Sequence, residues 1–189
     1  MKLLPAAHHK RMPWKNGGGE TVEIAIFPEN AGLGDFDWRV SMATVAKDGP
    51  FSIFEGIDRT LTILSGAGIA LGIDGKPAVH VTSSSTPLAF AADVPVEATL
   101  TDGPITDLNV MTRRGRYGHR VERLTIEGHH TFSSIGEDSI LLACDHGLSV
   151  VWNGQSADLA PQDAILLEDE AAITLRGHGT VIAISLVRL

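Results

Sequence analysis

The chain has 189 residues, and its 15 Lys and Arg against 23 Asp and Glu give a formal net charge of −8 at pH 7. A nucleic acid is therefore not an expected partner, because binding to a phosphate backbone depends on basic side chains. Hydrophobic residues make up 43% of the chain and charged residues 20%, a composition that excludes general disorder and predicts a globular protein.

The sequence also argues against a membrane or secreted protein. Its longest apolar runs, such as residues 180–187, have the length of a strand and fall short of the ~20 residues that a membrane-spanning helix needs. Residues 1–15 lack the apolar core of a signal peptide, and the single cysteine, Cys144, cannot form a disulfide within the chain. We expect a cytoplasmic protein with no membrane partner.

Glycine and proline spacing predicts an all-β fold, because 20 Gly and 9 Pro interrupt almost every window in which a helix of three turns could form. The clearest strand covers residues 36–43, and the next two, 59–64 and 69–73, are joined by a glycine turn and followed by the hairpin signal Asp74-Gly75. Further strands are expected at residues 22–27, 78–81, 88–91, 97–101, 107–112, 119–125, 140–143, 148–151, 164–167, 173–176 and 180–189.

A polar segment at residues 112–118, rich in Arg and Gly, separates about nine predicted strands from about six more. We therefore expect two halves, residues 1–115 and residues 116–189, and strand spacing of this kind is typical of a barrel or a sandwich. The unusual polar clusters lie almost entirely in the first half, so we place the ligand pocket there and give the second half a mainly structural role.

Residues 12–21 combine Lys15, Asn16, three glycines and Thr21 ahead of a strand. Glycines expose backbone N–H donors that suit a carboxylate or a phosphate. The alternative is a flexible loop that only leads into the strand. The segment lacks the Gly-Lys-Ser/Thr ending of a nucleotide-binding P-loop.

Two predicted strands each have one face with polar side chains that could point into a pocket. Arg39 and Ser41 lie on the polar side of the first, and Asn109, Met111 and Arg113 share one side of the second with Asp107. An inward-facing Arg offers a planar fork for a carboxylate, whereas the alternative is a solvated sheet face.

The segment between these strands brings Phe51, Ser52 and Phe54 close to Asp58 and Arg59. Neighbouring residues in a strand face opposite sides, so Asp58 and Arg59 each need another partner. For Arg59 that partner is either a ligand or a carboxylate of another strand, such as Asp37 or Asp107.

The sequence predicts no metal or cofactor. Its eight histidines form no His-x-His with a downstream Glu and no His-Glu-x-x-His, and Gly-x-Ser-x-Gly is absent. Cys144 stands beside Asp145 and His146, but a cysteine at a strand end is more often a small hydrophobic residue than a nucleophile.

Four ordered motifs resemble the HutD/Ves family: residues 13–25, 36–45, 48–59 and 107–114. The resemblance implies a bicupin, two small β-barrels in one chain, in bacterial cytoplasm and often encoded with histidine-utilisation enzymes. It implies a role in tuning histidine and urocanate catabolism by binding an intermediate such as N-formylglutamate, and no secure catalytic activity. Residues 159–167 resemble a cupin turn with Gln162 in place of a glycine, and the metal-binding histidines of active cupins are missing.

We therefore predict a non-enzymatic regulatory protein that binds a small anionic metabolite. The predicted ligand-binding residues are Lys15, Asn16, Thr21, Arg39, Ser41, Phe51, Ser52, Asp58, Arg59, Asn109, Met111 and Arg113. One alternative is a cupin enzyme that acts on a small carboxylate, with Asp58, Asp107 or Glu20 as general base. Another is an assembly factor, and the sequence leaves the choice between monomer and homodimer open.

Overall fold

The computed structural model describes residues 1–14, 17–134, 137–168 and 172–189. Almost all of this part of the chain is strand or turn, and the helix found within it is a single 3-10 turn, Ala6–His8. The predicted all-β class is confirmed. No helix in the described ranges is long and apolar enough to cross a membrane.

Contacts divide the chain into two compact units, Lys10–Gly118 and Met1–His9 together with His119–Leu189. The sequence analysis placed the division after residue 115 and assigned the first nine residues to the first barrel. They join the other unit because β1 (Lys2–Leu4) pairs with β16 (Ala164–Glu168). Nothing in a three-residue strand reveals which distant sheet edge it will complete.

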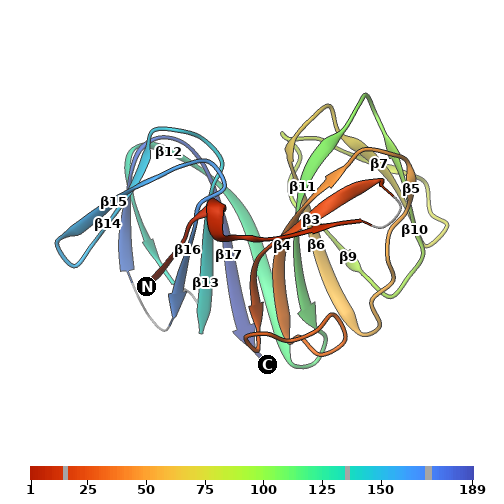
Figure 1. The fold of residues 1–189 in the computed structure, drawn as a ribbon, viewed down its shortest axis with the longest axis horizontal. Helices are drawn as coiled ribbons and strands as arrows, with labels where there is room; N and C mark the ends of the chain where they lie inside the picture. Colours follow the sequence, from red (N-terminus) through yellow and green to blue (C-terminus); the bar gives the residue numbers. More distant parts are fainter. Residues whose placement is uncertain (15–16, 135–136, 169–171) are drawn as a thin grey trace. The chain divides into compact units, whose positions relative to one another are not determined.

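The unit Lys10–Gly118 consists of two antiparallel sheets (Figure 1). Its strands are β2 (Lys10–Pro13), β3 (Gly19–Phe27), β4 (Trp38–Val45), β5 (Gly49–Pro50), β6 (Ile57–Ser65), β7 (Ile69–Ile73), β8 (Val79–Val81), β9 (Leu88–Ala91), β10 (Val96–Leu100) and β11 (Ile105–Arg113). The larger sheet has the order β2-β3-β4-β11-β6-β9, and the smaller has the order β5-β10-β7-β8. The predicted hairpin at Asp74-Gly75 connects β7 and β8, with φ of 52° and 68° at its two residues.

The core of this unit is apolar at one end and polar at the other. Ala43 and Val45 of β4 belong to a buried apolar cluster that also contains side chains of the smaller sheet, such as Leu71. Arg39 and Ser41 continue the same face of β4 beyond that cluster and are also buried. The opposite face of β4 is buried as well, so both faces of this strand are removed from water.

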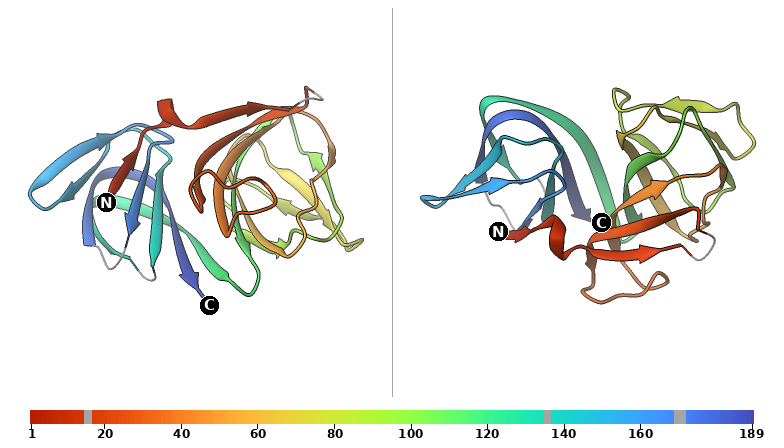
Figure 2. Two further views of the ribbon diagram at one scale, coloured as in Figure 1. Left: turned by 60° about the horizontal axis from the view of Figure 1, so that its bottom comes forward. Right: turned by 45° about the horizontal axis from the view of Figure 1, so that its top comes forward.

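The second unit is built on a single sheet whose order is β1-β16-β13-β17-β14-β15, with β12 paired to β17. Besides β1 and β16, its strands are β12 (Tyr117–Ser133), β13 (Asp138–Ala143), β14 (Leu148–Trp152), β15 (Gln155–Leu159) and β17 (Ala172–Arg188). Figure 2 shows β12 and β17 curving together along this unit. Its core is formed by an apolar cluster that includes Leu141, Val150 and Ile165.

One prediction in this unit is wrong. The sequence analysis ended a strand at Arg176 and began another at Thr180, whereas β17 is continuous through Gly177 and Gly179. A side chain at Gly177 would collide with the carbonyl oxygen of Gly147 on the adjacent chain segment. This glycine therefore permits close backbone packing inside a strand and does not mark a turn.

Candidate functional site

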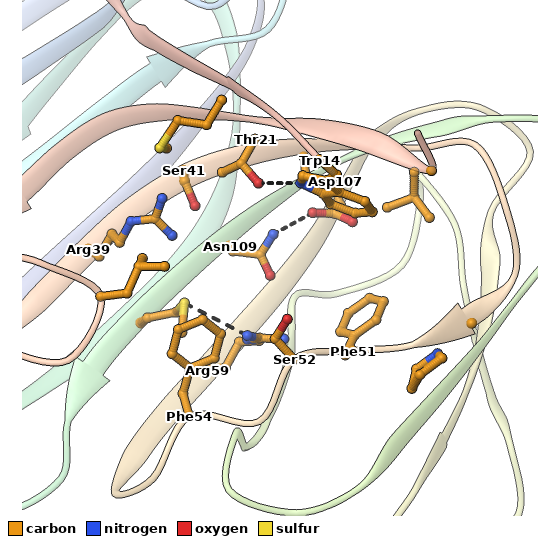
Figure 3. A pocket seen from close by; sticks show the side chains of 18 of the residues that line it. Trp14, Thr21, Arg39, Ser41, Phe51, Ser52, Phe54, Arg59, Asp107 and Asn109 are labelled. Atoms are coloured by element: carbon orange, nitrogen blue, oxygen red, sulfur yellow. Dashed lines mark hydrogen bonds between the residues drawn. The ribbon is translucent and has the colours of Figure 1, made fainter. Parts of the chain in front are cut away.

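A cavity of about 810 Å³ opens within the unit Lys10–Gly118 (Figure 3). Two neighbouring strands of the larger sheet, β4 and β11, form one wall with alternate residues, β6 adds Arg59, and the segment between β4 and β6 supplies aromatic side chains. This is the polar end of the core described above. Strand alternation therefore directs every second residue of β4 and β11 at a single space.

The structure brings eight of the predicted ligand-binding residues together on the cavity wall: Thr21, Arg39, Ser41, Phe51, Ser52, Arg59, Asn109 and Met111. Lys15 and Asn16 lie outside the described residues. The grouping follows from strand register, since Met111 stands opposite both Arg39 and Arg59, and Asn109 stands opposite Ser41.

Two predicted ligand-binding residues do not line the cavity. Asp58 faces the other side of β6 from Arg59, and its carboxylate accepts a hydrogen bond from Nε of Arg114 at 2.9 Å. Arg113 extends past the end of the cavity wall and donates to the carbonyl oxygens of Phe36 and Gly34, at 3.0 and 2.8 Å. Both side chains hold the chain's own loops in place.

Gly18 and Gly19, two of the three glycines in residues 12–21, have different roles. Gly18 lines the cavity. A Cβ atom on Gly19 would collide with the carbonyl oxygen of Thr44, so Gly19 permits the close approach of β3 and β4.

Arg59 is a buried cation that has no ionic partner among the described residues. Its residue is 6% exposed, and its guanidinium lies 5.3, 5.5 and 5.8 Å from the ring centroids of Phe54, Phe51 and Phe90. The hydrogen bond found for it is a weak one, from Nη2 to the sulfur of Met111 at 3.9 Å, and its Nε donates to no described atom.

No described carboxylate forms an ion pair with Arg59. Of the two partners that sequence analysis considered, Asp37 pairs with Arg116 at 2.6 Å and Asp107 lies beyond ion-pair distance. Burial, opposed by the charge of Asp107 and aided by that of Arg39, lowers the pKa of Arg59 to about 10. The group therefore remains charged at neutral pH.

Arg39 supplies a second cation to the same wall. Its residue is 5% exposed, and its Nε donates to the carboxylate of Glu23 at 2.8 Å. That contact fixes the plane of the guanidinium, while its two Nη groups form no hydrogen bond with the described residues. The two Nη groups of Arg39 are therefore available to bind a ligand in the cavity.

Asp107 and Trp14 are among the cavity residues to which sequence analysis did not assign ligand binding. Trp14 donates from its indole nitrogen to the Thr21 hydroxyl at 2.8 Å. Asp107 is 1% exposed and accepts a hydrogen bond from the Asn109 amide. Burial raises the pKa of Asp107 to about 7, although Arg59 and the Asn109 bond act in the opposite direction. Its shared face with Asn109 was the sequence signal that could have included it.

Active cupins hold a metal ion with histidines, and this cavity does not offer such a donor set. None of the described residues that line it is a histidine, and no group of three or more metal-binding side chains lies together in the described parts of the chain. Arg39 and Arg59 also place positive charge on the cavity wall, which disfavours a cation. The residues present do not fit a metal ion.

Comparison with known proteins identifies the family. The HutD family model matches residues 6–184. Protein Ves of Citrobacter koseri is 42% identical over 132 residues, which cover 67% of this chain and 66% of that protein. An uncharacterised 21.2 kDa protein in the hutC 3′ region of Pseudomonas putida is 32% identical over 189 residues, 99% of this chain and 97% of that protein.

Solved structures agree. A conserved protein of unknown function from Pseudomonas aeruginosa PAO1 has a TM-score of 0.90 and 33% identity, covering 98% of both chains. HutD from Pseudomonas fluorescens SBW25 has a TM-score of 0.83 and 30% identity, covering 100% of this chain and 98% of that one. Salicylate 1,2-dioxygenase from Pseudoaminobacter salicylatoxidans, at TM-score 0.61 and 7% identity over 79% of this chain and 70% of that one, shares the fold alone and confirms the predicted cupin architecture. The chain therefore belongs to the HutD family, which is associated with histidine utilisation.

Proposed function

We propose that the protein is a cytoplasmic, non-enzymatic sensor that binds a small anionic metabolite of histidine breakdown, such as N-formylglutamate, in this cavity. The observation that carries the proposal is the buried guanidinium of Arg59, which has no carboxylate partner among the described residues. A buried charge without a partner costs several kcal/mol. A ligand carboxylate would supply the missing counter-charge.

The second cation favours a ligand with more than one negative group. Arg39 and Arg59 stand on either side of Met111 in strand register, and their mutual repulsion contributes to the lowered pKa of Arg59. A dicarboxylate would offset both charges. The cavity of about 810 Å³ is in the usual range for small-molecule sites, and its aromatic walls suit an aliphatic ligand backbone.

One relative supports the pathway. The Pseudomonas putida relative is encoded in a hutC 3′ region. Binding alone suffices for regulation, because a ligand with different affinities for two states of a protein shifts the balance between them.

The test is calorimetric titration at pH 7 with N-formylglutamate, glutamate and urocanate. We expect saturable one-site binding of at least one compound, and about tenfold or greater weakening in Arg59→Gln, which corresponds to about 1.4 kcal/mol. The matched control is Arg120→Gln, because the Arg120 side chain is 72% exposed in the other unit and its ion pair within the described residues is with Glu122. Flat titrations with all three compounds, or unchanged binding in Arg59→Gln, would overturn the proposal.

Asp107 supports a second candidate, an enzyme that acts on a small carboxylate. A buried carboxyl whose pKa is about 7 can exchange a proton at neutral pH, as a general acid or base must. Proton NMR of each compound incubated with the protein tests this alternative. If a compound is converted by the protein and this conversion is lost in Asp107→Asn, the protein is an enzyme and not a sensor. Spectra that stay unchanged over many hours would favour binding alone.

A further inference from the structure

Strand register orders one face of β4, β11 and β6 into three rows. One row contains Arg39, Met111 and Arg59, the next contains Ser41, Asn109 and Leu61, and the third contains Ala43, Asp107 and Ile63. All of these except Leu61 and Ile63, which belong to the apolar core, line the cavity. The two rows at the ends therefore differ in charge: the first holds two cations and the third holds an acid. Figure 3 shows Asn109 lying between Arg39 and Asp107.

Strand geometry sets the separation of these rows. Asp107 and Met111 are four residues apart on β11, and a strand advances about 3.3 Å per residue, so the backbone positions of the first and third rows are about 13 Å apart. Side chains reaching into the cavity from both rows shorten the gap. A small molecule lying along β11 would thus have one end at the guanidinium groups and the other at Asp107.

The Asp107 end of the cavity offers hydrogen-bond acceptors that the protein leaves unpaired. The Asn109 amide donates one of its two N–H groups to one oxygen of Asp107, whereas the second oxygen of Asp107 and the side-chain oxygen of Asn109 accept no hydrogen bond from described residues. The indole N–H of Trp14 is already donated to Thr21. A ligand group placed there would satisfy these acceptors only by donating a hydrogen bond.

The row with Arg39 and Arg59 and the row with Asp107 favour different chemical groups on a ligand. A carboxylate suits Arg39 and Arg59, whereas a second carboxylate beside Asp107 would meet acceptors and, when Asp107 is ionised, a like charge. An N–H group suits the acceptors in either protonation state of Asp107, because a protonated carboxyl still keeps an acceptor oxygen. The other charged side chains on the cavity wall, Lys47 and Asp48, come from the segment that follows β4.

Resting on the proposed function, we infer that the cavity selects carboxylates that also carry an N–H donor, in an amide or an azole ring, and that Asp107 is the residue that determines this selection. Its carboxylate is held in place by Asn109 and lies in the same continuous cavity as the two guanidinium groups. A ligand that lacks the donor would bury these acceptors without partners, and sites built on buried hydrogen-bonding groups discriminate strongly against such analogues.

The test uses pairs of ligands that differ only in the N–H group. One pair is N-acetylglutamate and 2-acetoxyglutarate, in which an ester oxygen replaces the amide N–H. The other is pyrrole-3-propionate and furan-3-propionate, in which a ring oxygen replaces the ring N–H, and this pair separates an azole donor from an amide donor. In calorimetric titration of the intact chain, we expect the N–H member of at least one pair to bind at least tenfold more tightly than its partner.

The variant Asp107→Leu keeps a similar side-chain volume and removes the acceptor. In this variant we expect the preference within the selected pair to fall below threefold, through weaker binding of the N–H member and unchanged or tighter binding of its partner. A merely structural role would weaken both members equally. The preference in the unmodified protein does not depend on the variant, so it remains a test even if Asp107→Leu fails to fold.

Each outcome has a distinct meaning. Equal affinity within both pairs overturns the selection by an N–H donor and leaves carboxylate binding intact. A preference that persists in folded Asp107→Leu overturns the role of Asp107. Absence of binding by all four compounds, together with flat titrations of the metabolites tested above, overturns the proposed function itself.

Discussion

Replacing Asp107 by Asn should stabilise the protein at alkaline pH and have little effect at acidic pH. The carboxyl is fully buried, and its pKa rises from 3.8 to about 7 on folding. The folded protein therefore holds this proton more tightly than the unfolded chain does. As a result, stability is lost as pH rises from about 4 through 7, and the whole cost is present above pH 7.

The magnitude follows from the shift. About three pKa units correspond to an upper value of about 4 kcal/mol at 1.36 kcal/mol per unit. For a chain of this size, 1 kcal/mol changes the melting temperature by about 2–4 °C, so we expect an increase on the order of 5–15 °C at pH 8.5. Asn keeps the shape of Asp and can still accept from Asn109, so that removal of the charge is the main change.

Differential scanning calorimetry of both proteins at pH 5 and pH 8.5, without ligand, measures the effect. Asp158→Asn is the matched control, because Asp158 is an exposed strand residue of the other unit. A melting temperature that rises equally at both pH values, or that falls at pH 8.5, would refute the placement of Asp107 as a buried, poorly compensated acid. The predicted gain would mean that the chain retains Asp107 at a cost in stability, as residues retained for function often are.

Three further substitutions or measurements test other parts of the structure. Arg113→Gln removes two hydrogen bonds to loop carbonyls and should lower the unfolding free energy by about 1 kcal/mol in urea denaturation; ligand affinity that changes more than threefold would instead return Arg113 to the binding site. Phe54→Leu removes one ring from the cage around Arg59 and should weaken carboxylate binding about three- to tenfold by calorimetry, whereas unchanged binding would show that the ring does not hold the guanidinium. Cys144, whose burial raises its pKa to about 11, should react slowly with iodoacetamide at pH 8 and quickly in urea; rapid labelling of the folded protein would contradict that burial.

Part of the site could be predicted because strand alternation is visible in a sequence. The polar face of residues 36–43 placed Arg39 and Ser41 together, and the similar face of residues 107–113 placed Asn109 with Met111. The cavity contains these four side chains. The same rule separates Asp58 from its neighbour Arg59, so the prediction that both bind one ligand conflicted with the alternation that the sequence itself displayed.

Other features depend on register between distant strands. The Glu23 carboxylate that fixes Arg39 comes from β3, and no local pattern shows that these two side chains meet. The complete burial of Asp107 could not be predicted from local sequence, although its face could be predicted. Arg113 illustrates the reverse case: it has the alternation of a cavity residue but lies where the strand ends, beyond the cavity wall.

A crystal structure of the protein with bound N-formylglutamate would test the central claim most directly. We expect a ligand carboxylate within about 3 Å of guanidinium nitrogens of Arg59 and Arg39, as in charge-assisted hydrogen bonds. We also expect the amide N–H to lie toward Asp107. A ligand seated elsewhere, or a cavity that holds only water at a ligand concentration that saturates binding in solution, would contradict the assignment of this cavity as the binding site.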